Sequence, residues 1–197
     1  MRRTLFTSLL ALFVLILAAP LGAALAEPPD QKAAMEAWAK AGAPGPMHAF
    51  LAQFEGKWKA EITSYDNPGQ PPVKSEGASE SRMIYGGRYL VDEMTGRMMG
   101  QPYEGRGITG YDNVKKQFVS TWIDNMSTAI LVMTCAADPA GKVMRCQGTY
   151  DDPLTGKTFA MRSETRIEGP ARHVMRIYGD TPQAKDVLML EVVYTRL

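Results

Sequence analysis

From residue 56 onward the chain is a succession of short segments with a period of two, separated by sequences typical of turns. A period of two predicts β-strands, because successive side chains of a strand point to opposite faces. No segment long enough for a crossover helix lies between them, so we expect antiparallel strands that pair in chain order. The expected strands are about 56–66, 74–85, 88–98, 104–112, 116–124, 128–137, 143–151, 157–168, 172–179 and 186–196.

The separators between these segments are rich in residues that favour turns, chiefly Gly, Pro, Asn and Asp. Residues 67–72 predict a loop, Gly86-Gly87 a two-residue hairpin, and residues 152–156 and 168–170 predict turns. A meander of about ten strands in one domain avoids bare edges best by closing on itself. We therefore predict an all-β fold, an antiparallel up-and-down barrel of about ten strands that occupies residues 56–197.

Residues 105–126 form the clearest hairpin of the chain, with a polar turn over residues 112–116. The second strand of this hairpin carries apolar and polar side chains on one face: Phe118, Ser120, Trp122 and Asp124. An inner face in a fully packed barrel would be apolar throughout. The mixed face therefore favours a barrel that encloses a cavity.

Residues 27–55 are the only region with a helical pattern. Asp30 predicts the N-cap of a helix that contains Met35 and Trp38, an apolar pair at spacing i,i+3. The Gly and Pro residues of 42–46 end this helix. A second helical turn has three apolar side chains on one side: Phe50, Leu51 and Phe54. We expect this short N-terminal segment to pack on the barrel.

Residues 1–26 have the features of a secretory signal peptide. A basic start, an apolar run and a small-residue cleavage site follow one another at Arg2-Arg3, 5–19 and 24–26. A membrane anchor is the alternative, but Pro20 and Gly22 interrupt the apolar run. We expect an exported protein, periplasmic or extracellular, whose mature chain begins near Glu27.

The charge of the mature chain is nearly balanced. Removal of the signal peptide takes away two arginines and no acids, so Lys+Arg falls from 22 to 20 against 21 Asp+Glu, a net charge of −1. This balance gives no reason to expect nucleic acid or an acidic membrane as a partner. No second apolar run is long enough to span a bilayer, so no stable membrane anchor is expected after cleavage.

The chain has two cysteines, Cys135 and Cys146, and the segment between them centres on a turn at residues 138–142. A hairpin that turns there places the two cysteines opposite each other, where Cβ atoms are about 4.5–5.5 Å apart. Export also places them where disulfides persist. We predict a cross-strand disulfide; free thiols and a redox or metal pair are the alternatives, and no further metal ligand lies nearby in the sequence.

The tripeptide Gly56-Lys57-Trp58 resembles the G-x-W signature of lipocalins and their calycin relatives. In those proteins the Trp closes one end of the barrel, often beneath an Arg of the last strand. The resemblance implies the same structural role for Trp58 and Arg196. The chain departs from lipocalins because it has a helix before the first strand and none after the last, which weakens any transfer of lipocalin ligands.

Five longer motifs are similar to the bacterial domain-of-unknown-function family number 1579. They are Gly86–Leu90, Met98–Gly105, Gly110–Asn113, Ser120–Met126 and Asp152–Lys157. The resemblance covers about residues 54–196, nearly the whole mature chain. It implies a calycin-type, lipocalin-like barrel and no activity, because this family has none assigned.

His173 is one of two histidines in the chain. Its period-two neighbours, Met175 and Ile177, predict that it faces inward. Some small calycin-like barrels hold a haem iron with one inward histidine; a hydrogen-bonded, partly buried histidine is the interpretation we favour. The many methionines of the barrel fit an adaptable apolar interior better than a Cu(I) site.

Asp124 and Asn125, beside Trp122, are the most site-like group of the sequence. A carboxylate and an amide at a strand end can bind a ligand at a barrel mouth, and the carboxylate can act as a general acid or base. Asp-Asn at a strand end also commonly makes its own turn, which is the simpler interpretation.

We predict that the barrel binds a small apolar or amphipathic molecule. The candidate ligand-binding residues are Tyr89, Trp122, Asp124, Asn125, Met126 and His173. The alternatives are an enzyme that uses a barrel-mouth carboxylate on a small hydrophobic substrate, and a structural envelope module with a filled barrel. The sequence predicts no catalytic residue, metal site or cofactor, and leaves the oligomeric state open.

Overall fold

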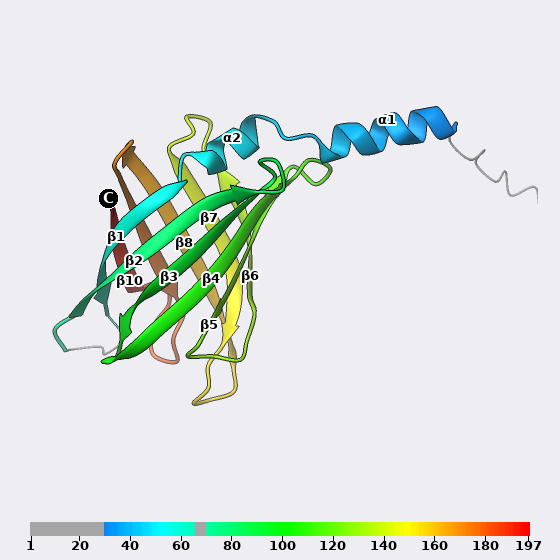
Figure 1. The fold of residues 1–197 in the computed structure, drawn as a ribbon. Coiled ribbons are helices and arrows are strands. Elements are labelled where there is room, and N and C mark those ends of the chain that lie inside the picture. Colours follow the sequence, from blue (N-terminus) through cyan, green and yellow to red (C-terminus); the bar gives the residue numbers. More distant parts are fainter. Residues whose placement is uncertain (1–29, 66–69) are drawn as a thin grey trace, which may run out of the picture.

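The computed structural model describes residues 30–65 and 70–197, in which two helices precede ten strands (Figure 1). The elements are α1 (Gln31–Gly42), α2 (Pro46–Ala52), β1 (Gly56–Ser64), β2 (Val73–Ile84), β3 (Tyr89–Met98), β4 (Gln101–Asp112), β5 (Gln117–Asp124), β6 (Leu131–Ala137), β7 (Val143–Asp151), β8 (Thr158–Gly169), β9 (Arg172–Gly179) and β10 (Val187–Arg196). The predicted strands match these one for one, with ends that differ by no more than three residues. The predicted signal peptide lies outside the described residues.

The ten strands form a closed antiparallel barrel, as predicted. Each strand pairs with its neighbours in the chain, and β1 pairs with β10 to close the ring. At this seam Trp58 lies opposite Arg196, and Ser64 lies opposite Leu190. α2 lies across one end of the barrel, where the turns after β2, β4, β6 and β8 also lie (Figure 1). We call this end the α2 end.

α2 closes the barrel because its apolar side enters the interior. The buried apolar side chains are Phe50, Leu51 and, just past the helix end, Phe54. The ring centroids of Phe50 and Phe118 of β5 are 5.7 Å apart. Pro46 begins the helix, where its missing N–H costs nothing. His48 Nδ1 accepts a hydrogen bond from the backbone N–H of Gly45 at 3.0 Å, which satisfies a free donor at the helix start.

α1 has the predicted cap but does not pack on the barrel. Asp30 Oδ1 accepts a hydrogen bond from the backbone N–H of Lys32 at 3.3 Å. Met35 and Trp38 are 67% and 79% exposed, and the helix projects away from the barrel (Figure 1). The segment packs on the barrel through α2, as expected, whereas the two apolar side chains of α1 do not make an apolar face wide enough to cover a sheet. Neither helix of the described chain is long and apolar enough to cross a membrane.

One of the predicted hairpins has the expected turn, and another does not. In the β4–β5 hairpin, Asp112 Oδ1 accepts hydrogen bonds from the backbone N–H groups of Val114 and Lys115, as a polar turn predicts. The β2–β3 connection is not a two-residue hairpin. Ile84 pairs with Tyr89, so four residues form the loop, and the φ angles of Gly86 and Gly87 are positive.

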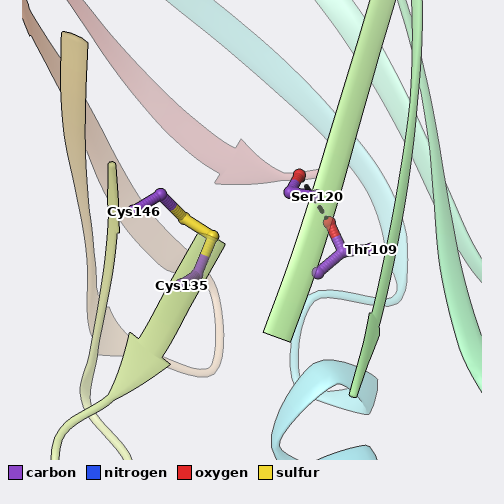
Figure 2. Close-up of a disulfide and its surroundings, with 4 residues drawn as sticks. All are labelled: Thr109, Ser120, Cys135 and Cys146. Carbon is purple, nitrogen blue, oxygen red and sulfur yellow. Dashed lines mark hydrogen bonds between the residues drawn. A yellow bond between two sulfur atoms is a disulfide. The ribbon is translucent and has the colours of Figure 1, made fainter. Parts of the chain in front are cut away.

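The predicted disulfide joins β6 to β7 (Figure 2). Cys135 and Cys146 are direct partners in the ladder, with Cα atoms 4.0 Å apart. The connecting turn is held by Asp138, whose Oδ1 accepts hydrogen bonds from the backbone N–H groups of Lys142 and Val143. The described residues contain no free cysteine.

Candidate functional site

The barrel encloses a cavity of about 220 Å³. It extends from Phe54 and His173 at the α2 end to Met98 and Trp122 toward the other end. Its sulfur-containing lining residues are Met94, Met98, Met133, Met144, Met161, Met175 and Cys146. Its polar lining residues are Ser79, Ser81, Asp92, Tyr103, Thr109, Ser120, Trp122, Ser163, Thr165, His173 and Tyr194. The interior is therefore apolar in bulk, with polar groups at a limited number of positions.

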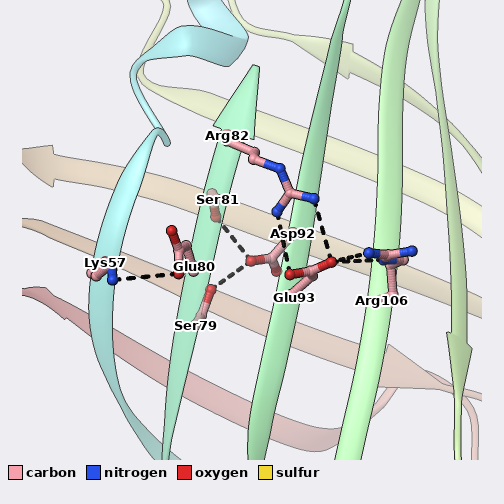
Figure 3. A network of polar contacts seen from close by, with 8 residues as sticks. All are labelled: Lys57, Ser79, Glu80, Ser81, Arg82, Asp92, Glu93 and Arg106. Atoms are coloured by element: carbon pink, nitrogen blue, oxygen red, sulfur yellow. Dashed lines mark hydrogen bonds and ion pairs between the residues drawn. The ribbon is translucent and has the colours of Figure 1, made fainter. Parts of the chain in front are cut away.

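Asp92 of β3 is the carboxylate that faces this cavity. Its Oδ1 atom accepts hydrogen bonds from the hydroxyls of Ser79 at 2.5 Å and Ser81 at 2.8 Å (Figure 3). The arrangement follows from the period of two, because Ser79 and Ser81 share one face of β2 and Ser81 pairs directly with Asp92. Its Oδ2 atom makes no hydrogen bond with any described residue.

The environment of Asp92 favours its neutral form. Burial raises the pKa of the Asp92 carboxyl above its usual value, and the nearby charge of Glu93 raises it further. The two serine hydroxyls act in the opposite direction, because they donate to the carboxylate. The Asp92 carboxyl is therefore protonated more readily than an exposed aspartate.

His173 of β9 lies at the α2 end among aromatic rings. Its imidazole stacks on Tyr194 with centroids 4.4 Å apart, and it meets the rings of Trp58 and Phe54 edge to face at 4.5 and 5.2 Å. Neither ring nitrogen hydrogen-bonds a described residue. Burial, with a smaller contribution from Arg196, lowers the pKa of His173 to about 4, so the imidazole is neutral at pH 7.

Trp58 and Arg196 close the barrel behind His173. The guanidinium carbon of Arg196 lies 4.2 Å from the centroid of the Trp58 ring, and the guanidinium donates to the backbone oxygens of Glu55 and Pro170, each at 2.8 Å. Trp58 Nε1 donates to the Phe54 backbone oxygen at 2.9 Å. This is the arrangement that the G-x-W resemblance implies.

Trp122 of β5 forms the cavity wall away from the α2 end. Its Nε1 donates to the Tyr103 hydroxyl at 3.0 Å and to Asp124 Oδ2 at 3.2 Å. Burial raises the pKa of Tyr103 to about 12, so the phenol is neutral. Gly105 and Gly107 of β4 lie directly beneath the indole, and a Cβ at Gly107 would stand 2.9 Å from Trp122 Cε3. These glycines make room for the indole.

The structure brings two of the six candidate ligand-binding residues to the cavity, namely Trp122 and His173. Tyr89 is 42% exposed and lies on the outer face of β3, over Gly110. Met126 is also on the surface, at 46% exposed. Tyr89, Asp124, Asn125 and Met126 do not line the cavity.

Asp124 and Asn125 build the turn after β5. Asp124 Oδ1 accepts a hydrogen bond from the Met126 backbone N–H at 2.9 Å. The Asn125 side chain bonds to the backbone of Glu104 and of Pro102, each at 3.1 Å. Both side chains of the Asp-Asn pair are thus used in local structure, which is the simpler of the two interpretations of the sequence.

Sequence reasoning missed the cavity residues Asp92, Ser79, Ser81, Tyr103 and Tyr194. The signal for Asp92 was present in its strand, where Leu90, Asp92 and Met94 alternate with other residues. A charged residue between two apolar ones on the inward face of a barrel strand marks a functional candidate. Among the described residues, no three His, Cys, Asp or Glu side chains lie close enough together to hold a metal ion.

Solved structures similar to this chain are β-barrels. The crystal structure of Rv2717c from M. tuberculosis has 17% sequence identity and a TM-score of 0.57, over 79% of this chain and 99% of that protein. A redesigned β-barrel, b11L5F_LGL, has 14% identity and a TM-score of 0.41, over 75% of this chain and 94% of that one. At 17% identity, the likeness to Rv2717c shows the fold alone. No protein of curated function matches the sequence.

The family comparison covers both the cavity and the α2 end. The model of one family, described as "Protein of unknown function (DUF1579)", matches residues 43–196. The match begins just before α2 and ends at Arg196, so it contains all ten strands. The chain therefore belongs to the DUF1579 family.

Proposed function

We propose that the barrel binds a small amphipathic molecule in its cavity. The observation that carries this proposal is the cavity of about 220 Å³, with apolar bulk and polar groups that converge from β2, β3, β4 and β5. Binding sites for small molecules typically combine apolar lining with a few placed polar groups. A barrel that served only as a scaffold would gain stability by filling such a space, because interior voids are costly.

The volume limits the size of the ligand. An apolar cavity of about 150 Å³ holds benzene. Benzene has six non-hydrogen atoms, so by the same ratio the cavity of about 220 Å³ holds a molecule of roughly nine. A short-chain or single-ring compound fits this description, whereas a membrane lipid does not fit inside.

A cavity-filling variant tests the proposal. Ser163 of β8 lines the cavity, and Ser163→Leu introduces a larger side chain there. The probe is 2-phenylethanol, a neutral compound with about nine non-hydrogen atoms, and the measurement is its Kd by calorimetry. We expect Ser163→Leu to weaken binding at least about tenfold, because the ligand and the leucine compete for the same space.

The matched control is Ala160→Leu, an exposed position of the same strand that gains a leucine outside the barrel. This variant is expected to bind the probe as the wild type does. Equal binding to the wild type and to Ser163→Leu, or no binding to the wild type, would contradict the proposal.

The enzyme alternative has less support. A barrel-mouth acid or base needs a free carboxylate, but Asp124 uses Oδ1 in its own turn and Oδ2 for Trp122 Nε1. The filled structural barrel is also less supported, since about 220 Å³ of the interior is open. We therefore place binding first.

We also infer that the protein works in an exported, oxidising compartment. The disulfide between Cys135 and Cys146 supports this, because disulfides persist outside the cytosol. Intact-mass analysis of the protein from its producing cell tests the inference. It should show a chain that begins near Glu27 with both thiols oxidised; a chain that retains residues 1–26 would contradict cleavage.

A further inference from the structure

We propose that the cavity selects small organic cations, and that the Oδ2 atom of Asp92 binds the ammonium group of a primary amine. This inference rests on the proposed binding function and names the chemical class of its ligand. It is carried by the one carboxylate that lines the cavity and by the absence of a cation among the lining residues.

One carboxylate oxygen of Asp92, Oδ2, is not used by the described residues. Both serine hydroxyls donate to Oδ1, so Oδ2 has no partner among the described residues. A buried carboxylate without compensation is costly, and the cost falls when a cation or a hydrogen-bond donor reaches it. An ammonium group supplies both a charge and donors.

No side chain of the described residues neutralises Asp92. The residues that line the cavity include neither Lys nor Arg. The nearest arginines in the network, Arg82 and Arg106, bind Glu93 on the outer face of β3 (Figure 3). Among the lining residues, only the His173 side chain can become positively charged, and it is neutral at pH 7. A positive charge that stabilises the ionised form of Asp92 therefore comes from the ligand.

The cavity also offers partners for the other N–H groups of the ammonium and for the apolar body of the ligand. Serine hydroxyls that donate to Asp92 keep free lone pairs, so Ser79 and Ser81 can accept the remaining N–H groups. The Thr109 and Ser120 hydroxyls form a further polar pair at 2.9 Å in the same wall (Figure 2). The apolar body then contacts the methionines across the cavity, which adapt to irregular shapes.

The same features exclude small organic anions. A carboxylate ligand would add a second negative charge beside Asp92 in a site without a cation. A neutral alcohol can donate one hydrogen bond but brings no charge. We therefore expect affinities in the order amine, alcohol, carboxylate, since charge-assisted hydrogen bonds are about twice as strong as neutral ones.

Three probes of nearly equal shape test this order: 2-phenylethylamine, 2-phenylethanol and phenylacetate. Their Kd values are measured by calorimetry at neutral pH on the wild type and on Asp92→Asn, which keeps the shape of the side chain and removes its charge. We expect the wild type to bind the amine at least about tenfold more tightly than the alcohol. Asp92→Asn should lose this preference, because removal of the charge weakens binding of the amine more than binding of the alcohol.

Glu93→Gln is the matched control, because Glu93 is the next residue of β3 and points outward. This variant should keep the amine preference. If Asp92→Asn does not fold, the pH dependence of the wild type provides a second measurement. As the pH is lowered from neutral toward the His173 pKa of about 4, amine affinity should fall as Asp92 takes up a proton, and alcohol affinity should not.

The other titratable groups near Asp92 keep their charge state over that range. Glu93 stays ionised because its arginine partners lower the pKa of its carboxyl. Tyr103, with a pKa of about 12, and Tyr194, whose pKa burial raises, stay neutral. His173 stays neutral above its pKa of about 4.

Each outcome is informative. If the alcohol binds as tightly as the amine and Asp92→Asn changes nothing, the cavity is a binding site without cation selectivity and this inference is overturned alone. If none of the three probes binds, the binding function fails and the inference fails with it.

Discussion

At the scale of single residues, two neighbouring acids of β3 have opposite environments. Glu93 lies on the outer face between Arg82 and Arg106, whose hydrogen bonds lower the pKa of its carboxyl. Asp92 lies on the inner face, where burial raises its pKa. Successive side chains of a strand point to opposite faces, so Glu93 faces solvent and Asp92 faces the interior. A surface ion pair contributes little to stability, whereas an inward carboxylate costs stability.

The lowered pKa of His173 predicts that the folded protein loses stability in acid. Its pKa falls from 6.5 to about 4 on folding, so the unfolded chain takes up a proton first as the pH drops. Between pH 6.5 and about 4 the folded state should lose about 3 kcal/mol through this residue, and no more below that range. Urea denaturation of the wild type and of His173→Gln at several pH values measures the difference.

The raised pKa of Asp92 acts in the opposite direction in both proteins, because its folded form binds a proton before the unfolded chain does. The difference between the wild type and His173→Gln therefore isolates the histidine. We expect a flatter stability curve for the variant below pH 6.5. Parallel curves would show that the imidazole takes up its proton without cost in the folded barrel.

At the scale of elements, packing at the α2 end stabilises the barrel, whereas α1 contributes little to its stability. Trp58 is 1% exposed, carries the Arg196 guanidinium over its ring and donates to the Phe54 backbone oxygen. Trp58→Ala should cost about 3–5 kcal/mol of unfolding free energy, because it leaves a cavity and an unpaired carbonyl. Trp38→Ala, on the exposed face of α1, should change stability by no more than about 0.5 kcal/mol.

Guanidinium denaturation of the two variants side by side provides the measurement. Each removes one indole, so the contrast reports the packing of the ring and not its chemistry. Unchanged stability in Trp58→Ala would refute the structural role that the G-x-W resemblance implies.

The elements themselves could be predicted because their signals are local. The period of two and the turn residues lie within each segment, so all ten strands and the Asp112 turn follow from the sequence. The packing of α1 could not be predicted in this way, because it depends on how much apolar surface the helix offers to a partner. The alternation of Leu90, Asp92 and Met94 could have marked Asp92, but its contact with Ser79 and Ser81 depends on the register of β3 against β2, which is set by the closed sheet.

At the scale of the whole molecule, the hydrogen-bonded ladders around the barrel differ in length. β6 is the shortest strand, with seven residues, and it pairs with β5 and with β7 over five residues each. The β1–β10 seam, on the other side of the ring, pairs over seven residues. The disulfide joins β6 to β7, so it lies where the hydrogen-bonded ladder is shortest. Cys146 also lines the cavity, and the same covalent link therefore supports the site.

Loss of the disulfide should increase local opening at β6 and β7 more than opening of the rest of the barrel. The chain-entropy model gives about 3 kcal/mol for a loop that separates its ends by 11 residues. Because the β6–β7 hairpin already restrains this loop, we expect a cost of about 2–3 kcal/mol in the double variant Cys135→Ala, Cys146→Ala. Amide hydrogen exchange should accelerate in β6 more than at the β1–β10 seam, since opening begins where fewest ladder bonds must break. Equal acceleration in both places would show that the ring opens only as one cooperative unit, and that the disulfide acts on the unfolded chain alone.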